Sequence, residues 1–207
     1  MTVSEQDARQ ALDVSRETLE RLDVYADLLK KWSPRINLVS KESVRHLWGR
    51  HILDSAQLLR IADGGQKWVD LGSGGGFPGA VVAIIAREHR PDLRLTLIES
   101  DQRKAVFLRT VARETDIRFE VLAERIETVA AQNCDILSAR ALASLDALLG
   151  FADRHMATSG TALFQKGASW EKEVCDAEKA WRFSVEPIES QTERAAAILK
   201  ITGVSRV

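Results

Sequence analysis

The sequence predicts an α/β fold in which a mostly parallel sheet is covered by helices on both faces. From residue 67 onward, short apolar runs typical of buried strands alternate with segments of helical periodicity. A glycine-rich loop, residues 72–79, separates the first apolar run from the next helix. The chain has 207 residues, and its beginning is helical in pattern. We therefore expect a helical extension over residues 1–62, packed on a domain over residues 63–207.

Composition indicates an ordinary globular protein. The net charge is −1, so no global charge points to nucleic acid or to an acidic membrane. The only cysteines, Cys134 and Cys175, lie far apart, which favours a reduced compartment without disulfides. No apolar run approaches the length of a membrane span, and no signal peptide is recognisable. We expect a soluble, cytoplasmic protein.

The extension, from about residue 4 to residue 62, is expected to contain three helices. Thr2 has the spacing of a capping-box residue, and Ser15 can cap the second helix. Pro34 should end that helix, because proline disfavours helical geometry in the residue before it. A third helix is expected over residues 42–61.

Charge is uneven along the extension. Residues 1–29 hold seven acidic and three basic residues, whereas residues 30–60 hold seven basic and two acidic residues, a local net charge of +5. Two tryptophans lie within the basic segment. A basic patch with aromatic residues is one sign of nucleic-acid contact, for which Arg45 and Arg50 are candidates. An ordinary solvated helix face with buried tryptophans is the alternative.

His51, Asp54 and Ser55 are neighbours on the third expected helix. A Ser-His-Asp catalytic triad needs an exposed nucleophile and an oxyanion hole, which adjacent turns of one helix do not supply. A metal site is not expected either, for want of further ligands nearby. We predict that His51 is a packed, hydrogen-bonded residue that braces the extension.

The glycine loop indicates a cofactor that carries a nucleoside. A dinucleotide fingerprint counted from Gly72 fails at Phe77, and one counted from Gly74 begins three residues beyond Leu71. The alternative pattern, an acid followed by Gly-x-Gly-x-Gly, begins at Asp70. It resembles the first motif of S-adenosylmethionine-dependent methyltransferases. A tight turn without a ligand is a further alternative.

Glu99 ends the next expected strand, residues 93–99. A carboxylate at such a strand end accepts hydrogen bonds from ribose hydroxyls. Both candidate cofactors contain a ribose, so Glu99 supports a nucleoside site without choosing between them. The alternative is a solvated carboxylate at a strand end.

Helices and strands then alternate to the end of the chain. The expected helices are 77–89, 102–114, 126–131, 144–155 and 169–180. After the first strand, which begins at Lys67, the expected strands are 93–99, 118–122, 134–138, 161–165, 182–188 and 195–201, the last two as an antiparallel hairpin. In such sheets the ligand lies at the carboxyl ends of the strands. The glycine loop, Glu99, the turn at 125–127, Arg140 and Lys166 all fall at these ends.

Several motifs, spread in order over nearly the whole chain, resemble one family. They are Ile36-Asn37-Leu38, His51-Ile52-Leu53-Asp54-Ser55, Asp70 to Gly79, Arg125-Ile126-Glu127, Ser138-Ala139-Arg140-Ala141, Lys166-Gly167, and Arg194 ahead of Ile198-Leu199-Lys200-Ile201. The chain resembles the rRNA small-subunit methyltransferase G family, also called glucose-inhibited division protein B. The resemblance implies a class I, Rossmann-like methyltransferase fold with a seven-stranded sheet. It also implies methylation of N7 of a guanine in 16S small-subunit ribosomal RNA, with S-adenosylmethionine as cofactor.

The resemblance also implies roles for individual residues. The implied cofactor-binding residues are Asp70, Gly72, Ser73, Gly74, Gly76, Phe77, Glu99, Arg125, Ile126, Glu127 and Arg140. Arg140 is the candidate catalytic residue, acting by positioning, because guanine N7 is already a bare acceptor and needs no general base. Lys166 and Arg194 are the candidates for phosphate contact. The alternatives are a surface ion pair for Arg140 and solvated strand ends for Lys166 and Arg194.

The expected partner is small-subunit ribosomal RNA or the assembling subunit. We expect a monomer that binds no metal ion and does not contact a membrane. Three other functions stay open from the residues. They are a methyltransferase with a protein or small-molecule substrate, a nucleotide-sensing regulator without turnover, and an NAD-dependent oxidoreductase. The sequence does not exclude the regulator, because methyl transfer to guanine N7 needs no diagnostic catalytic residue.

Overall fold

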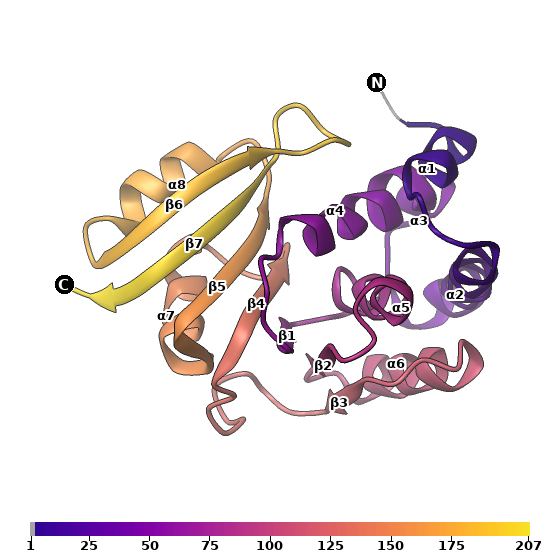
Figure 1. The fold of residues 1–207 in the computed structure, drawn as a ribbon, viewed down its shortest axis with the longest axis horizontal. Helices are drawn as coiled ribbons and strands as arrows, with labels where there is room; N and C mark the ends of the chain where they lie inside the picture. Colours follow the sequence, from indigo (N-terminus) through magenta and orange to yellow (C-terminus); the bar gives the residue numbers. More distant parts are fainter. Residues whose placement is uncertain (1–2) are drawn as a thin grey trace.

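A computed structural model describes residues 3–207 and has at its centre a seven-stranded sheet of order β3-β2-β1-β4-β5-β7-β6 (Figure 1). The strands are β1 Lys67–Leu71, β2 Arg94–Ile98, β3 Glu120–Leu122, β4 Cys134–Arg140, β5 Met156–Lys166, β6 Trp181–Glu189 and β7 Ala197–Arg206. The first five strands pair in parallel, and β7 pairs antiparallel with both β5 and β6. The predicted mostly parallel α/β sheet is confirmed.

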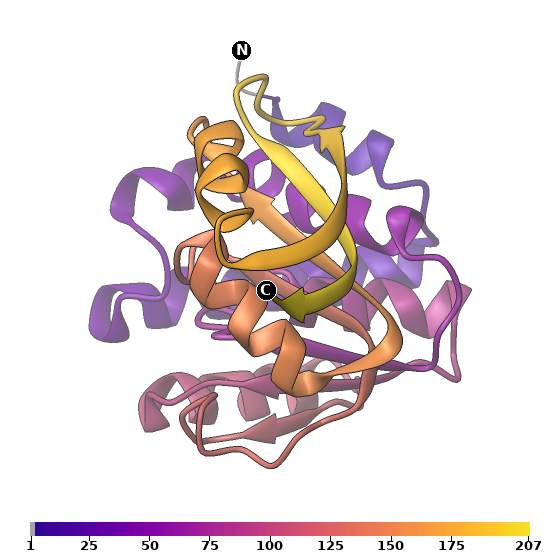
Figure 2. The same ribbon diagram turned by 90° about the vertical axis from the view of Figure 1, so that its left-hand side faces the viewer.

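Helices cover both faces of this sheet. They are α1 Glu5–Ala11, α2 Arg16–Ile36, α3 Lys41–Arg45, a π-helix Trp48–Leu53, α4 Asp54–Ile61, α5 Gly79–His89, α6 Gln102–Glu114, α7 Leu145–His155 and α8 Trp170–Ala177. In Figure 1, α2, α4, α5 and α6 lie on one side and α7 and α8 on the other. Figure 2, turned by 90°, shows α7 and α8 on the near side together with β6 and β7, and the indigo helices of the extension farther away.

The strands divide their side chains between two cores, because successive residues of a strand point to opposite faces. Trp68 packs in the core beneath α2, α4, α5 and α6, whereas the next residue, Val69, packs in the core beneath α7. The indole N–H of Trp68 donates to the hydroxyl of Ser138, 2.8 Å away on the neighbouring strand β4. A buried indole donor is thereby paired inside the sheet.

The helical extension shares the first of these cores. Leu22, Tyr25 and Leu29 of α2 are fully buried, and α2 contacts α5 and α6. The hydroxyl of Tyr25 donates to the backbone carbonyl of Gly75 over 2.6 Å, so α2 reaches the glycine loop itself. That residues 1–62 form a separate unit from residues 63–207 stays a prediction.

Two expectations about helix ends are revised. Thr2 lies outside the described residues, and Ser4 caps α1 by accepting from the backbone N–H of Asp7. Ser15 caps α2 as predicted. The expectation that Pro34 ends α2 is wrong: the helix continues to Ile36, and Asn37 closes it in a left-handed conformation with φ 51°. Proline removes one backbone hydrogen bond there, and packing of Ile36 against the core offsets that loss.

The single helix expected over residues 42–61 is also wrong. The chain forms α3, then the π-helix, then α4, which begins at Asp54. A π-turn holds an extra residue, so side chains on either side of it leave the regular helical face. Gly49 lies at this point, and a Cβ atom there would meet the backbone oxygen of Val3 at 2.6 Å. The close approach of residue 3 explains why a glycine occupies the π-helix.

The short helix expected over residues 126–131 is replaced by a turn. The backbone N–H groups of Thr128 and Val129 both bond to the carbonyl of Arg125. The carbonyl of Ile126 is bonded instead to Nε2 of His155 in α7, 3.0 Å away. This tertiary partner takes an acceptor that a helix would have used.

Candidate functional site

The glycine loop is held from beneath by Asp70, the fourth residue of β1. Its carboxylate accepts from the hydroxyl of Ser138 at 2.7 Å and from the backbone N–H of Gly79 at 3.2 Å. Burial raises the pKa of Asp70 to about 6, and the hydrogen bonds from Ser138 and from the backbone N–H of Gly79 oppose that rise. Asp70 is fully buried. Among the predicted cofactor residues it therefore braces the two ends of the loop rather than lining its surface.

Three glycines of the loop adopt the left-handed backbone conformation that side chains disfavour. Gly72, Gly74 and Gly76 have φ of 60°, 53° and 95°. A Cβ atom on Gly76 would lie 2.8 Å from Cβ of Ala80 and 2.9 Å from the hydroxyl of Tyr25, whereas one on Gly74 would meet only a backbone oxygen at 3.8 Å. Gly76 is thus required by packing, and Gly74 leaves open space above the loop.

Glu99 lies directly beside this open part of the loop, one strand away. Its Oε2 accepts from the backbone N–H of Gly74 and its Oε1 from the backbone N–H of Asp101, each at 2.8 Å. Both carboxylate oxygens keep free lone pairs, because each can accept more than one hydrogen bond. The predicted acid is therefore held in place by two backbone donors at the carboxyl end of β2.

The other predicted cofactor residues fall on the same edge of the sheet. Ser73 is buried and donates to the backbone carbonyl of Asp70 at 3.1 Å. Ile126 is nearly buried, and its neighbours Arg125 and Glu127 are exposed on the turn that follows β3. The sheet thus brings Gly74, Glu99 and this turn to the ends of three adjacent strands.

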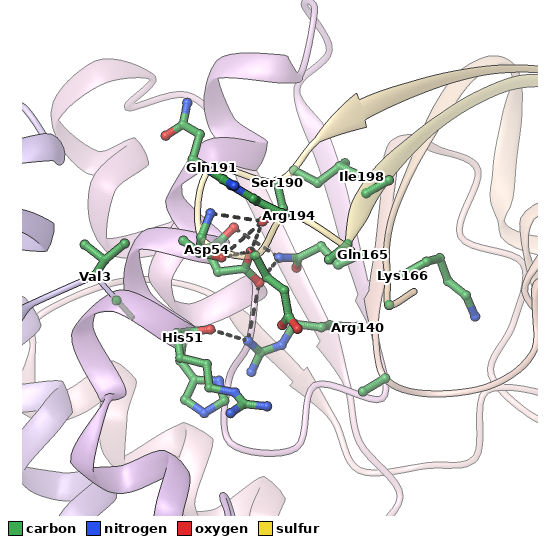
Figure 3. Close-up of a pocket in the computed structure, with 18 of the residues that line it drawn as sticks. Val3, His51, Asp54, Arg140, Gln165, Lys166, Ser190, Gln191, Arg194 and Ile198 are labelled. Carbon is green, nitrogen blue, oxygen red and sulfur yellow. Dashed lines mark hydrogen bonds and ion pairs between the residues drawn. The ribbon is translucent and has the colours of Figure 1, made fainter. Parts of the chain in front are cut away.

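A cavity lies beside the glycine loop, at the ends of β4 and β5. This cavity, of about 760 Å³, is lined by the π-helix, by Arg140 and Gln165 at the strand ends, and by the hairpin loop 190–196 between β6 and β7 (Figure 3). We call it the Asp54 cavity, after the carboxylate that joins its walls. Its volume falls within the ~300–1,000 Å³ common for ligand pockets.

Asp54 connects three of these walls. Its Oδ1 accepts from the hydroxyls of Thr192 at 2.9 Å and Ser190 at 3.2 Å, and from the side-chain amide of Gln57 at 2.9 Å. Its Oδ2 accepts from the side-chain amide of Gln165 and lies 3.7 Å from the guanidinium of Arg140. Burial raises the pKa of Asp54, and the charge of Arg140 opposes that rise.

Arg140 stands between the Asp54 cavity and the glycine loop. Its guanidinium carbon lies 4.7 Å from the centre of the Phe77 ring, and its side chain is only 17% exposed. The alternative of a surface ion pair is therefore replaced by a largely buried pair with Asp54. Phe77, which directly precedes the cap residue of α5, is also nearly buried.

His51 also packs against Phe77, with the two rings stacked at 4.9 Å between ring centres. It is packed as predicted, but the predicted hydrogen bond is wrong: within residues 3–207 neither ring nitrogen has a partner. Burial, together with the charges of Arg140 and Arg50, lowers the pKa of His51 to about 3. The imidazole is therefore neutral at physiological pH, with one donor and one acceptor unused.

The predicted RNA-binding cations divide into two groups. Arg50 and Arg194 are exposed and line the Asp54 cavity. Lys166 lines it too, but its ammonium is paired with Glu173 at 2.7 Å and donates to a backbone carbonyl. Arg45 is exposed beside a separate, smaller depression of about 70 Å³.

The sequence does not predict the polar residues that line the Asp54 cavity. It suggests a chemical role for Asp54 only as a possible triad member, although Asp54 belongs to the same motif as His51. Gln165, Ser190 and Thr192 carry no signal in the sequence, because they meet Asp54 only through the fold. Within the described residues 3–207, no group of three possible metal ligands occurs. In the same part of the chain, no helix has the length and apolarity needed to cross a membrane.

Comparison with known proteins identifies a family that this chain matches. A family model described as rRNA small subunit methyltransferase G, GidB, matches residues 18–198. A relative from Ruegeria sp. (strain TM1040), named ribosomal RNA small subunit methyltransferase G, is 60% identical over 196 residues, which are 95% of this chain and 96% of the relative.

Solved structures with little sequence identity share the fold. A mutant of MtNAS in complex with S-adenosylmethionine matches with a TM-score of 0.59 at 13% identity, over 97% of this chain and 84% of that one. A TehB-like SAM-dependent methyltransferase from Corynebacterium glutamicum matches with a TM-score of 0.54 at 14% identity, over 72% and 86%. These likenesses concern the arrangement of the sheet and its helices.

Proposed function

This chain belongs to the rRNA small subunit methyltransferase G family, and we propose that it transfers the methyl group of S-adenosylmethionine to N7 of a guanine in 16S small-subunit ribosomal RNA. The observation that carries the proposal is the contact between the glycine loop and the Asp54 cavity. Phe77 of the loop packs against Arg140, and Arg140 lines the cavity. A cofactor held at the loop and a target base in the cavity would meet at Arg140.

The glycine loop is built to hold the cofactor. The open space above Gly74 admits a ligand against the backbone, and the fixed carboxylate of Glu99 can accept from ribose hydroxyls. Phe77 would flank the cofactor, and Ile126 with its neighbours Arg125 and Glu127 would lie near the adenine. Arg140 would touch the cofactor from the side of the cavity. When bound, the cofactor supplies a methyl group carried by a positively charged sulfur.

The residues around the cavity suit methyl transfer to a nitrogen lone pair. Guanine N7 is a hydrogen-bond acceptor without a proton, so its attack on the methyl carbon needs no base. The N7–carbon bond forms as the sulfur–carbon bond breaks, and the electron pair of that bond goes to sulfur. Neutral His51 neither gives nor takes a proton in this step. Positioning of the two reactants then supplies the main part of the catalysis.

The cations of the cavity mouth are proposed to hold the RNA. Arg50 and Arg194 are exposed there and can contact phosphates, as Arg45 can beyond the cavity. Lys166 would do so only after leaving Glu173. We also propose that the protein acts as a monomer in the cytoplasm. Its substrate would be small-subunit RNA, either naked or within the assembling subunit.

The test uses Arg140→Lys and Arg140→Ala with small-subunit RNA. Arginine can bind phosphate through two directed hydrogen bonds and stack beside a base, which lysine cannot copy. We expect Arg140→Lys to keep the fold and most cofactor affinity while single-turnover methylation falls by about 100-fold, and Arg140→Ala to lose more. Isothermal calorimetry measures the affinity for the cofactor. Methylation by Arg140→Ala at the parent rate, or transfer to an atom other than guanine N7, would refute the proposal.

A further inference from the structure

Gln165 presents a buried acceptor to the Asp54 cavity. The side chain is 8% exposed, and its Nε2 donates to the backbone carbonyl and to Oδ2 of Asp54. Because both of these partners are acceptors, the amide nitrogen must face them and the amide oxygen must face away. That oxygen, Oε1, has no partner within residues 3–207. A buried carbonyl without a donor is costly, which makes it a candidate for reserved contact with a ligand.

We propose that Oε1 of Gln165 accepts a hydrogen bond from the exocyclic amino group, N2, of the target guanine and so selects guanine over other bases. The proposal rests on the proposed function, because it assigns the Asp54 cavity to the target base. It adds a specificity-determining residue to the proposed site.

The order of the strands determines how the target base would be oriented in the cavity. The glycine loop follows β1, Arg140 ends β4 and Gln165 lies near the end of β5, opposite Arg140 in the pairing of the two strands. Neighbouring strands are about 4.8 Å apart, so Gln165 lies roughly 10 Å from the loop side of the cleft. A base with N7 directed at the loop points its opposite edge toward β5. In guanine that edge carries N2.

The same orientation explains discrimination. Guanine offers two donors on its Watson–Crick edge, N1–H and N2–H₂, to a carbonyl oxygen. Adenine has no amino group at its position 2, and its N1 is an acceptor, so it would leave Oε1 buried and unpaired. A site built around a hydrogen bond rejects an analogue that lacks the donor far better than an apolar pocket rejects a change of shape.

The base must leave its stack to reach this position, as enzymes that modify bases in RNA commonly require. The hairpin loop and the π-helix both line the cavity, and they contribute the exposed residues Arg194 and Arg50 to it. These cations can hold the phosphates on either side of an extruded nucleotide. Gln165, by contrast, is a buried part of the lining and belongs to β5.

The experiment compares guanine with inosine, which lacks only N2, at the methylated position of a synthetic small-subunit RNA segment. For the parent protein, we expect kcat/KM for methylation of inosine to be about 10- to 100-fold below that for guanine. In Gln165→Met, which removes the acceptor and keeps a similar length, guanine methylation should fall and the ratio of guanine to inosine should approach one.

Thr192→Val is the matched control. It removes another hydrogen bond to Asp54 but keeps Oε1 of Gln165, so the preference for guanine should persist even if the rate changes. A parent enzyme that methylates guanine and inosine equally would overturn the proposal whether or not Gln165→Met folds. So would a guanine preference that survives in folded Gln165→Met. No methylation of guanine by the parent would instead refute the proposed function.

Discussion

The two halves of the cleft satisfy their polar groups in opposite ways. Under the glycine loop, the carboxylates of Asp70 and Glu99 are paired with donors of the protein itself. Around the Asp54 cavity, the carboxylate is also paired, but the amide oxygen of Gln165 and both ring nitrogens of His51 have no partner among residues 3–207. In the first half each carboxylate already has donors from the protein, whereas the second half leaves buried side-chain atoms without a partner.

This difference separates two kinds of recognition. A loop whose side chains are used internally offers a ligand its backbone and its open space, which suits a cofactor of fixed shape. A cavity with unused side-chain atoms can distinguish one hydrogen-bonding pattern from another. We therefore expect damage to the first half to affect folding and cofactor binding, and damage to the second to affect the RNA.

The largest effect is expected within the glycine loop, from Gly76→Ala. Its Cβ would press on Ala80 and the hydroxyl of Tyr25, so unfolding in urea should show a loss of about 3 kcal/mol or more. Gly74→Ala is the matched variant, because only its backbone conformation is strained, at a cost of about 1 kcal/mol. It should stay folded and lose at least tenfold in cofactor affinity. Equal stabilities for the two variants would contradict the packing argument.

A pH-dependent effect is expected from Asp70. Its pKa is about 6 in the folded protein against 3.8 for the free side chain, so the fold favours the protonated acid. Stability attributable to Asp70 is present below pH 4 and is lost as the pH rises toward 6, by on the order of 3 kcal/mol. Asp70→Asn lacks this ionisation. Urea unfolding of both proteins from pH 4 to pH 7 should show the difference in stability changing over this range, and a constant difference would count against it.

A smaller effect, confined to the RNA side, is expected from Asp54→Asn. The amide can accept at only one atom, so some of the hydrogen bonds from Ser190, Thr192 and Gln165 cannot form and the hairpin loop is held less firmly. The KM for RNA should rise about tenfold, with cofactor affinity nearly unchanged. Steady-state methylation and calorimetry measure the two. If Asp54→Asn instead loses affinity for the cofactor and keeps its KM for RNA, the two halves of the cleft do not have the separate roles described above.

The smallest effect is expected at the surface. Replacing Arg45 and Arg50 by glutamine should weaken RNA binding and reduce the slope of log affinity against log salt by about 0.7 for each phosphate that the protein no longer neutralises. Arg16→Gln is the control, since Arg16 is exposed within the acidic first segment and paired with Glu20. Binding titrations at several salt concentrations provide the slopes. If the double variant keeps the parent slope, the basic segment is an ordinary solvated surface.

The fold is predictable from local patterns. Apolar runs, the glycine loop and the acids at Asp70 and Glu99 follow one another in sequence, and parallel strands must bring their ends together. The revised elements depend on distant partners. The π-helix accompanies the approach of residue 3 to Gly49, and the turn that replaces the expected helix after residue 125 accompanies the bond between His155 and the carbonyl of Ile126.

The candidate site divides in the same way. Arg140 can be placed at a strand end from sequence, but its pairing with Asp54 cannot, because the two residues are 86 positions apart. Lys166 shows the same problem: its position follows from the strand pattern, whereas its pairing with Glu173, on the following helix, does not. Spacing identifies which edge of the sheet a residue occupies, and tertiary contacts decide whether its charge is free.

The hydrogen bond from Tyr25 to the carbonyl of Gly75 connects the helical extension to the glycine loop, so that a change in the motion of either segment affects the other. Any ligand that narrows the motion of the loop must also slow the opening of α2, because the two share this bond and a buried ring contact with Phe77 at 5.5 Å. Backbone amides of α2 should therefore exchange hydrogen with solvent more slowly when the cofactor is bound, although the helix lies outside the strand–helix repeat that contains the loop. Hydrogen exchange in the N-terminal helices would then change when the cofactor binds, although these helices contribute no strand to the sheet.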